Sequence, residues 1–117
     1  MTGGRAPKRK GDTFERAVVA YLRSHGFPGA ARAYGAGRPD GIGDIADVPG
    51  FVIECKAHRT LDLAVFMDQA VREAGSRSVV PVVVAKRRGQ DTGNAYVVLR
   101  LSDFARIALD REGVLDA

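Results

Sequence analysis

Two residues of opposite charge stand two positions apart in the segment Phe51–Lys56, whose sequence is FVIECK. The segment is typical of a β-strand, in which residues two apart share a face. The residues at 51, 53 and 55 therefore point into a core, while Glu54 and Lys56 lie side by side on the other face. This pair is either an exposed ion pair of little energetic weight or the acid and the ammonium group of an active site.

A third charged residue, Asp44, begins the strand that we predict just before this segment. Pro49-Gly50 after it is a turn signal, so the two strands should form a hairpin that brings Asp44 close to Glu54 and Lys56. Two carboxylates that converge in this way suit Mg²⁺ or Mn²⁺, because a divalent cation offsets their mutual repulsion. The alternative is that Asp44 is a turn residue that bonds its own backbone.

Glu15, in the first predicted helix, fits two different roles. The run Asp12-Thr13-Phe14-Glu15 matches a capping box, in which Asp12 caps the helix and Glu15 reaches back to it. At 100° per residue, however, Glu15 lies only about 20° around the helix from Leu22, at the edge of the apolar face. From that edge it would lean over the sheet toward a metal ion, so both roles stay open.

These residues need a scaffold, and the periodicity of apolar residues predicts one. The order α-β-β-β-α-β-β-α predicts an α/β protein with a mixed central sheet flanked by helices. The run before residue 86 is apolar and β-branched, as expected for a strand buried on both faces. We expect one helix from Asp12 to about Gly26 and a second at 62–74, capped by Gly75. A third helix should follow Ser102 as its cap and turn Phe104, Ile107, Ala108 and Leu109 inward. The expected strands are 30–34, 44–48, 51–56, 79–85 and 95–101.

Length and composition favour one basic domain. The chain has 117 residues, and we expect residues 1–10 to be a flexible basic arm and residues 11–117 a single domain. Its net charge of +4 favours a polyanion as partner. Cys55 is the single cysteine, which excludes an intrachain disulfide and a Cys-based zinc cluster. No apolar run is long enough for a bilayer and no secretory start is present, so we expect a cytoplasmic protein with no membrane partner.

Several basic side chains are candidates for contacts with a nucleic-acid backbone, because phosphate contacts usually position such a substrate. Each is equally well explained as a solubilising surface charge, and for His58 a solvated loop position is the simpler interpretation. The candidates are Arg9, Lys10, Arg32, Arg38, His58, Arg59, Lys86, Arg87 and Arg88.

Three short strings resemble a known family: G-D-I at 43–45, I-E-C-K at 53–56, and K-G-D-T-F-E-R at 10–16. Together they look like the PD-(D/E)XK nuclease superfamily, and more closely they are similar to archaeal-type Holliday junction resolvases and their phage relatives. The resemblance covers roughly residues 10–105 and implies a restriction-endonuclease-like α-β-β-β-α-β core.

The resemblance implies a Mg²⁺-dependent endodeoxyribonuclease, with Mn²⁺ as a substitute, that hydrolyses phosphodiester bonds of branched DNA. Asp44 and Glu54 would be metal ligands, Glu15 an accessory ligand, and Lys56 the group that orients water or stabilises the phosphate. Resolving a four-way junction in recombination and repair implies a homodimer, because a two-fold dimer supplies two related sites. The compartment would be the cytoplasm, or the host cytoplasm if a phage encodes the chain.

The same strings leave a second candidate for the motif aspartate, and they allow two other functions. Asp40 follows Pro39 in the Gly-rich segment 35–43, and it replaces Asp44 as the motif residue if the hairpin is longer or out of register. A rival enzyme is another nuclease of this superfamily that cuts flaps, duplex DNA or RNA. A rival of another class is a non-catalytic DNA-binding module with the same fold.

Overall fold

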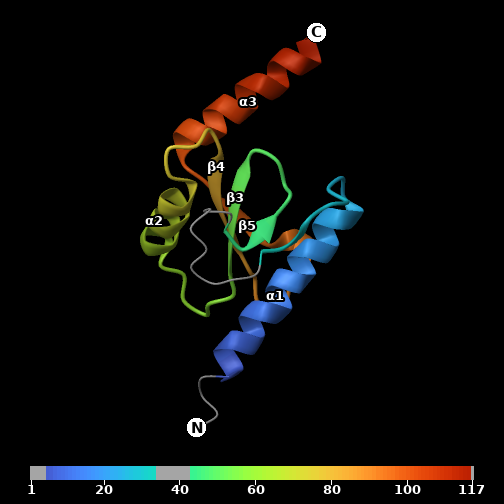
Figure 1. Ribbon diagram of the computed structural model, residues 1–117, viewed down its shortest axis with the longest axis vertical. Coiled ribbons are helices and arrows are strands. Elements are labelled where there is room, and N and C mark those ends of the chain that lie inside the picture. The colour runs from blue at the N-terminus through green and yellow to red at the C-terminus, as the bar shows by residue number, and fades with distance from the viewer. Residues whose placement is uncertain (1–4, 34–42, 117) are drawn as a thin grey trace.

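The computed structural model describes residues 5–33 and 43–116, with side chains for 11–33 and 43–111. Its described residues form one five-stranded mixed sheet in the order β1-β2-β3-β4-β5, flanked by helices (Figure 1). The predicted α/β class and element order are confirmed. The elements are α1 (Arg5–Ser24), β1 (Ala31–Arg32), β2 (Ile45–Ala46), β3 (Phe51–Lys56), α2 (Leu63–Ala74), β4 (Val80–Ala85), the 3₁₀ turn η1 (Thr92–Asn94), β5 (Tyr96–Val98) and α3 (Leu101–Asp116).

The centre of the sheet is the parallel pair β3 and β4, which run in register from Phe51↔Val80 to Lys56↔Ala85. The hairpin predicted between β2 and β3 is present, with Ile45 opposite Ile53. Its turn is closed by the Phe51 N–H, which donates to the Val48 carbonyl at 3.3 Å, and Gly50 takes a φ of 87°. A type II turn needs a positive φ at this third position, which glycine adopts without strain.

Two helices cover opposite faces of this pair (Figure 1). Phe14 and Val18 of α1 pack with Ile53 and Val82 in the larger apolar core. On the other face Phe66 and Ala70 of α2 pack with Val83. The helix α2 begins after Asp62, whose carboxylate accepts the Val65 N–H, and it ends at Gly75 as predicted. β4 is buried on both faces, as expected for a strand between two helices.

The first helix begins earlier than predicted. Its first residue is Arg5 rather than Asp12, so residues 5–10 are helical and are not the flexible arm that we expect. Pro7 suits the first turn of a helix because its missing N–H would have no partner there, and lysine and arginine are good helix formers. Asp12 lies inside the helix, so of the two roles left open for Glu15 the capping box with Asp12 is excluded.

The last helix also differs from the prediction. It begins at Leu101, so Ser102 is its second residue and not its cap. Of its predicted inward side chains only Ile107 packs against the core, while Phe104 and Leu109 are 55% and 67% exposed and Ala108 is exposed. Figure 1 shows the reason, because α3 runs away from the sheet instead of lying on it.

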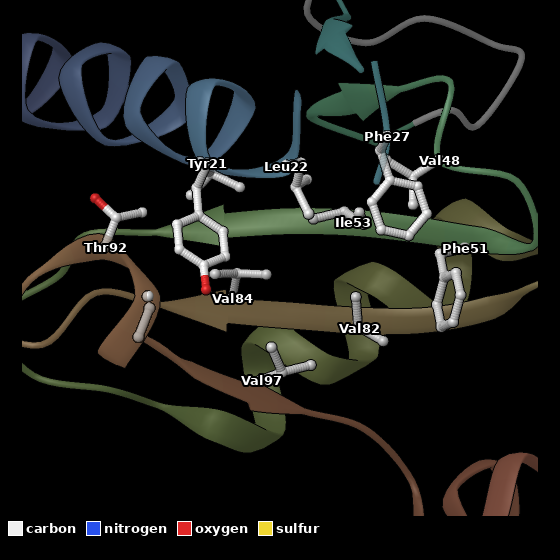
Figure 2. Close-up of a pocket in the computed structure, with 13 residues that line it drawn as sticks. Tyr21, Leu22, Phe27, Val48, Phe51, Ile53, Val82, Val84, Thr92 and Val97 are labelled. Carbon is white, nitrogen blue, oxygen red and sulfur yellow. The ribbon is translucent and has the colours of Figure 1, made fainter. Parts of the chain in front are cut away.

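The α1 face of the sheet is not fully covered. An apolar cavity of about 240 Å³ lies there between α1 and strands β3 to β5, and Leu22, Ile53 and Val82 contribute to its walls. Figure 2 shows these side chains pointing into it from both sides. No helix in the described residues is both long and apolar enough to cross a membrane.

Candidate active site

Glu54 and Lys56 share one face of β3, as the strand alternation predicts, and both contact α2. Gln69 joins them: its Nε2 donates to Glu54 Oε1 at 3.0 Å, and its Oε1 accepts from Lys56 Nζ at 2.7 Å. Glu54 is only 2% exposed, and Lys56 Nζ lies 5.0 Å from the centroid of the Phe66 ring. The exposed ion pair that we considered at these two positions is therefore excluded.

Asp44 lies beside β3 and is held by two contacts across the hairpin. Its backbone N–H donates to the Ile53 carbonyl at 2.7 Å, and its Oδ2 accepts the Cys55 N–H, also at 2.7 Å. A longer β2 would satisfy the Cys55 N–H with a backbone carbonyl, so the carboxylate replaces a strand partner. This explains why β2 begins one residue later than predicted. The described contact of the Asp44 side chain is with β3, which is not the local turn bond of the alternative interpretation.

Gly43 allows Asp44 and Glu54 to come close together. A Cβ at this position would lie 2.8 Å from the Ile53 carbonyl oxygen and 3.1 Å from Glu54 Oε2. Gly43 also has a φ of 83°, a backbone conformation that residues with a side chain rarely adopt. Any larger residue here would push the hairpin away from the Glu54 carboxylate.

Glu15 reaches this region from α1, and an arginine holds it there. Arg32 of β1 donates from Nε to Glu15 Oε1 at 3.1 Å and from Nη2 to Asp12 Oδ1 at 2.8 Å. The arginine side chain is 15% exposed. Arg32, which we predict as a phosphate contact, therefore already pairs with two carboxylates and fixes the position of Glu15.

All three carboxylic acids have a raised pKa. Burial raises the pKa of Glu54 to about 8, with further contributions from the charges of Asp44 and Glu73 and a smaller opposing effect from Lys56. Burial is also the largest cause of the raised pKa values of Asp44 and Glu15, and the charge of Asp44 is the next cause for Glu15. Each of these acids is therefore harder to ionise than it would be in water, and an added positive charge would favour the ionised form.

This donor set suits a divalent cation by type and charge. Carboxylate oxygens are the ligands that Mg²⁺ prefers, and a cation would relieve the repulsion between Asp44 and Glu54. Among the described side chains, no three His, Cys, Asp or Glu residues are arranged to hold a metal as they stand. Because Arg32 turns Glu15 toward itself, a cation would use Asp44 and Glu54 together with a rotated Glu15 or with other ligands.

Most of the predicted nucleic-acid residues with described side chains gather at the same end of the sheet. His58 and Arg59 follow β3 and are exposed, and Lys86 and Arg88 follow β4 and are exposed. Because β3 and β4 are parallel, both segments leave the sheet at one end, and the Lys86 N–H donates to the Lys56 carbonyl at 2.9 Å.

Three further predicted positions are not tested by these contacts. Arg9 and Lys10 belong to the first turns of α1, where side chains are not described. Arg38 lies outside the described residues, and so does Asp40, the competitor of Asp44.

Sequence reasoning missed Gln69 and Gly43. Gln69 follows Phe66 by three positions, so it borders the inward face of α2, and a polar residue there is a signal that could have been used. Gly43 offered a weaker signal, because the sequence around it contains many other glycines.

Comparison of the chain with known proteins finds no matching family model, no similar curated protein and no similar solved structure. The site therefore has to be interpreted from its own geometry and charge.

Proposed function

We propose that this protein is a metal-dependent DNA endonuclease of the PD-(D/E)XK type, with its active site at Glu15, Asp44, Glu54 and Lys56. One observation carries the proposal: the carboxylates of Asp44 and Glu54 lie near one ammonium group, that of Lys56, and the charge of Lys56 lowers the pKa of both. Glu15 of α1 is close enough for the charge of Asp44 to raise its pKa. The basic segments at the ends of β3 and β4 supply a surface for a polyanion beside the site.

Each residue has a distinct role in this proposal. Asp44 and Glu54 would hold Mg²⁺, with Glu15 as an accessory ligand, and the bound ion would supply positive charge that polarises the phosphate and acidifies water. Lys56 adds charge where the phosphate becomes more negative during attack. Gln69 keeps the Lys56 ammonium and the Glu54 carboxylate at fixed positions.

The attacking group in this proposal is water and not a side chain. Cys55, the nearest thiol, is buried, and burial raises its pKa so that it stays protonated. Its side chain also faces the apolar core instead of the Glu54 face. In a direct hydrolysis the water oxygen would bond to phosphorus while the P–O3′ bond breaks, and the 3′ oxygen would leave as a hydroxyl after taking up a proton. Such a reaction needs no covalent intermediate on the chain.

The substrate that we propose is a branched DNA, with the four-way junction first, cut by a homodimer. Leu101, Phe104 and Leu109 on α3 are 80%, 55% and 67% exposed, and a second copy of the chain would cover these apolar side chains. We assign the dimer contact to this part of α3. Replacing Phe104 with aspartate should then halve the mass measured by sedimentation, whereas an unchanged mass would remove this contact from the proposal.

The activity is tested with a labelled four-way junction, a flap, a plain duplex and an RNA, each with Mg²⁺ and with a chelator. We expect metal-dependent cleavage of the junction, loss of cleavage in Glu54→Gln and Lys56→Ala, and wild-type activity in the exposed control Asp68→Asn. Preference for another substrate would keep the nuclease and remove the junction. Salt-sensitive binding without any cleavage would instead indicate a DNA-binding module.

A further inference from the structure

Tyr96, the first residue of β5, is an aromatic side chain that the core does not use. It is 55% exposed, although β4, the strand beside it, is among the most buried parts of the described chain. The Arg87 guanidinium lies 4.5 Å from the centroid of its ring. An exposed contact of this kind contributes only modestly to folding, so stability alone does not account for an aromatic residue here.

The strand register places Tyr96 on the same face of the sheet as Lys56. Lys56 pairs with Ala85 on β4, and Ala85 pairs with Tyr96 on β5. Residues directly opposite one another in neighbouring strands point to the same face. With strands about 4.8 Å apart, the Tyr96 backbone lies about 10 Å from that of Lys56. One alanine, whose side chain is a single methyl group, separates them in this row.

The surroundings of Tyr96 carry positive charge. Lys86 and Arg88 flank Arg87 in the segment that follows β4, and both are exposed. A nucleic-acid strand with its reacting phosphate at Lys56 would therefore meet basic side chains as it passes Tyr96. Because stacked nucleotides rise about 3.4 Å per step, 10 Å corresponds to about three nucleotides.

We propose that Tyr96, with Arg87 against its ring, is a stacking platform for an unpaired nucleobase within about three nucleotides of the scissile phosphate. Single-strand-binding proteins combine the same elements, an aromatic face and arginines beside a basic track. The bases of an intact duplex already stack on one another, so only a base freed from pairing has a face to offer. The platform therefore selects DNA with unpaired nucleotides at a branch or fork over a perfect duplex. It rests on the proposed function for its position beside the reacting phosphate.

Binding measurements test the platform separately from catalysis. Fluorescence anisotropy would follow the full-length protein, without metal, on a fork with single-stranded arms, on a four-way junction and on a paired duplex. The variants are Tyr96→Leu, which removes the aromatic face, and Tyr96→Phe, which keeps it. Val97→Ala is the matched control, because Val97 is the next residue on the same strand, is 57% exposed and lies on the opposite face. Thermal melting would establish that all three variants fold.

We expect Tyr96→Leu to weaken fork binding by about tenfold and duplex binding by less than twofold, with Tyr96→Phe and Val97→Ala near wild type. A 2-aminopurine base scanned through the fork should be quenched at one position by the wild type and not by Tyr96→Leu. Fork affinity unchanged in Tyr96→Leu, or an equal loss on fork and duplex, would overturn the platform. Cleavage tests the other proposal: a protein that binds forks through Tyr96 but never cuts would overturn only the nuclease.

Discussion

The two faces of β3 behave as different parts of the molecule. Toward α1 the strand presents Ile53 and its apolar neighbours to a core that includes an open apolar cavity (Figure 2). Toward α2 it presents Glu54, which is just as buried but is a carboxylate with a raised pKa. Burial of apolar surface stabilises the fold, whereas burial of an incompletely compensated carboxylate opposes folding. The apolar face therefore stabilises the strand on which the charged face is built.

The largest effect on stability should come from the apolar face. Ile53→Ala removes a side chain that is 5% exposed, and we expect a loss of about 3 kcal/mol in the free energy of unfolding. Urea unfolding would measure it, with Val97→Ala as an exposed control that loses under about 0.5 kcal/mol. A loss as small in Ile53→Ala as in the control would mean that this face does not stabilise the strand.

Gly43 and Gly50 separate backbone strain from crowding at the site. Both have a positive φ, but a Cβ at Gly50 meets nothing within 4 Å, whereas a Cβ at Gly43 meets Ile53 and Glu54. We expect Gly50→Ala to cost about 1 kcal/mol in chemical unfolding and Gly43→Ala about 2 to 3 kcal/mol. Only Gly43→Ala should also weaken Mn²⁺ binding. Equal losses of stability and of Mn²⁺ affinity in the two variants would argue against close packing at Gly43.

On the charged face a substitution should raise the free energy of unfolding, whereas Ile53→Ala lowers it. Glu54 has an ordinary pKa of 4.5 and a folded pKa of about 8, so between these values the unfolded chain releases a proton that the folded chain keeps. Metal-free wild type should therefore lose stability as the pH rises through this window, and Glu54→Gln should lose less, because only Asp44 and Glu15 still have raised pKa values. At pH 6, which lies 1.5 units above the ordinary pKa of 4.5, we expect the variant to be more stable by about 2 kcal/mol, since one pKa unit corresponds to about 1.4 kcal/mol.

Thermal melting from pH 4 to pH 9 would follow this difference, with Asp68→Asn as the exposed acid-to-amide control. The gain of Glu54→Gln over wild type should vanish near pH 4, where both proteins are uncharged at this position. A gain in melting temperature that stays constant from pH 4 to pH 9 would contradict a raised pKa of the Glu54 carboxyl group.

The smallest effect should come from the residue that links the two charged groups. Gln69→Leu leaves Glu54 without its amide donor and Lys56 without its acceptor, which should cost about 1 kcal/mol of stability. Cleavage should fall about tenfold and its pH profile should move to higher pH, because the Glu54 carboxylate loses a stabilising hydrogen bond. A fall in activity with an unmoved pH profile would indicate a packing role only.

The same comparison explains what could be predicted from sequence. The bounds of β3 were predicted without error and those of α2 within one residue, because alternation and the Asp62 and Gly75 caps are local signals. Local signals failed for α1, because the capping pattern at residues 12–15 lies inside the helix and the basic residues of its first turns were not interpreted as helical. They also failed for α3, because an apolar stripe does not reveal whether anything packs on it.

The candidate site was predictable in part. The shared face of Glu54 and Lys56 follows from strand period, and the approach of Asp44 follows from the turn. The burial of Glu54, the Gln69 bridge and the hold of Arg32 on Glu15 depend on how helices pack on the sheet, which residue spacing alone does not determine.

The most direct test of the central claim is calorimetric titration of the metal-free protein with Mn²⁺ at pH 8. We predict saturable binding by the wild type and by Asp68→Asn, and binding at least about tenfold weaker by Asp44→Asn and Glu54→Gln. Equal Mn²⁺ affinity in all four proteins would contradict the claim that these carboxylates form a cation site.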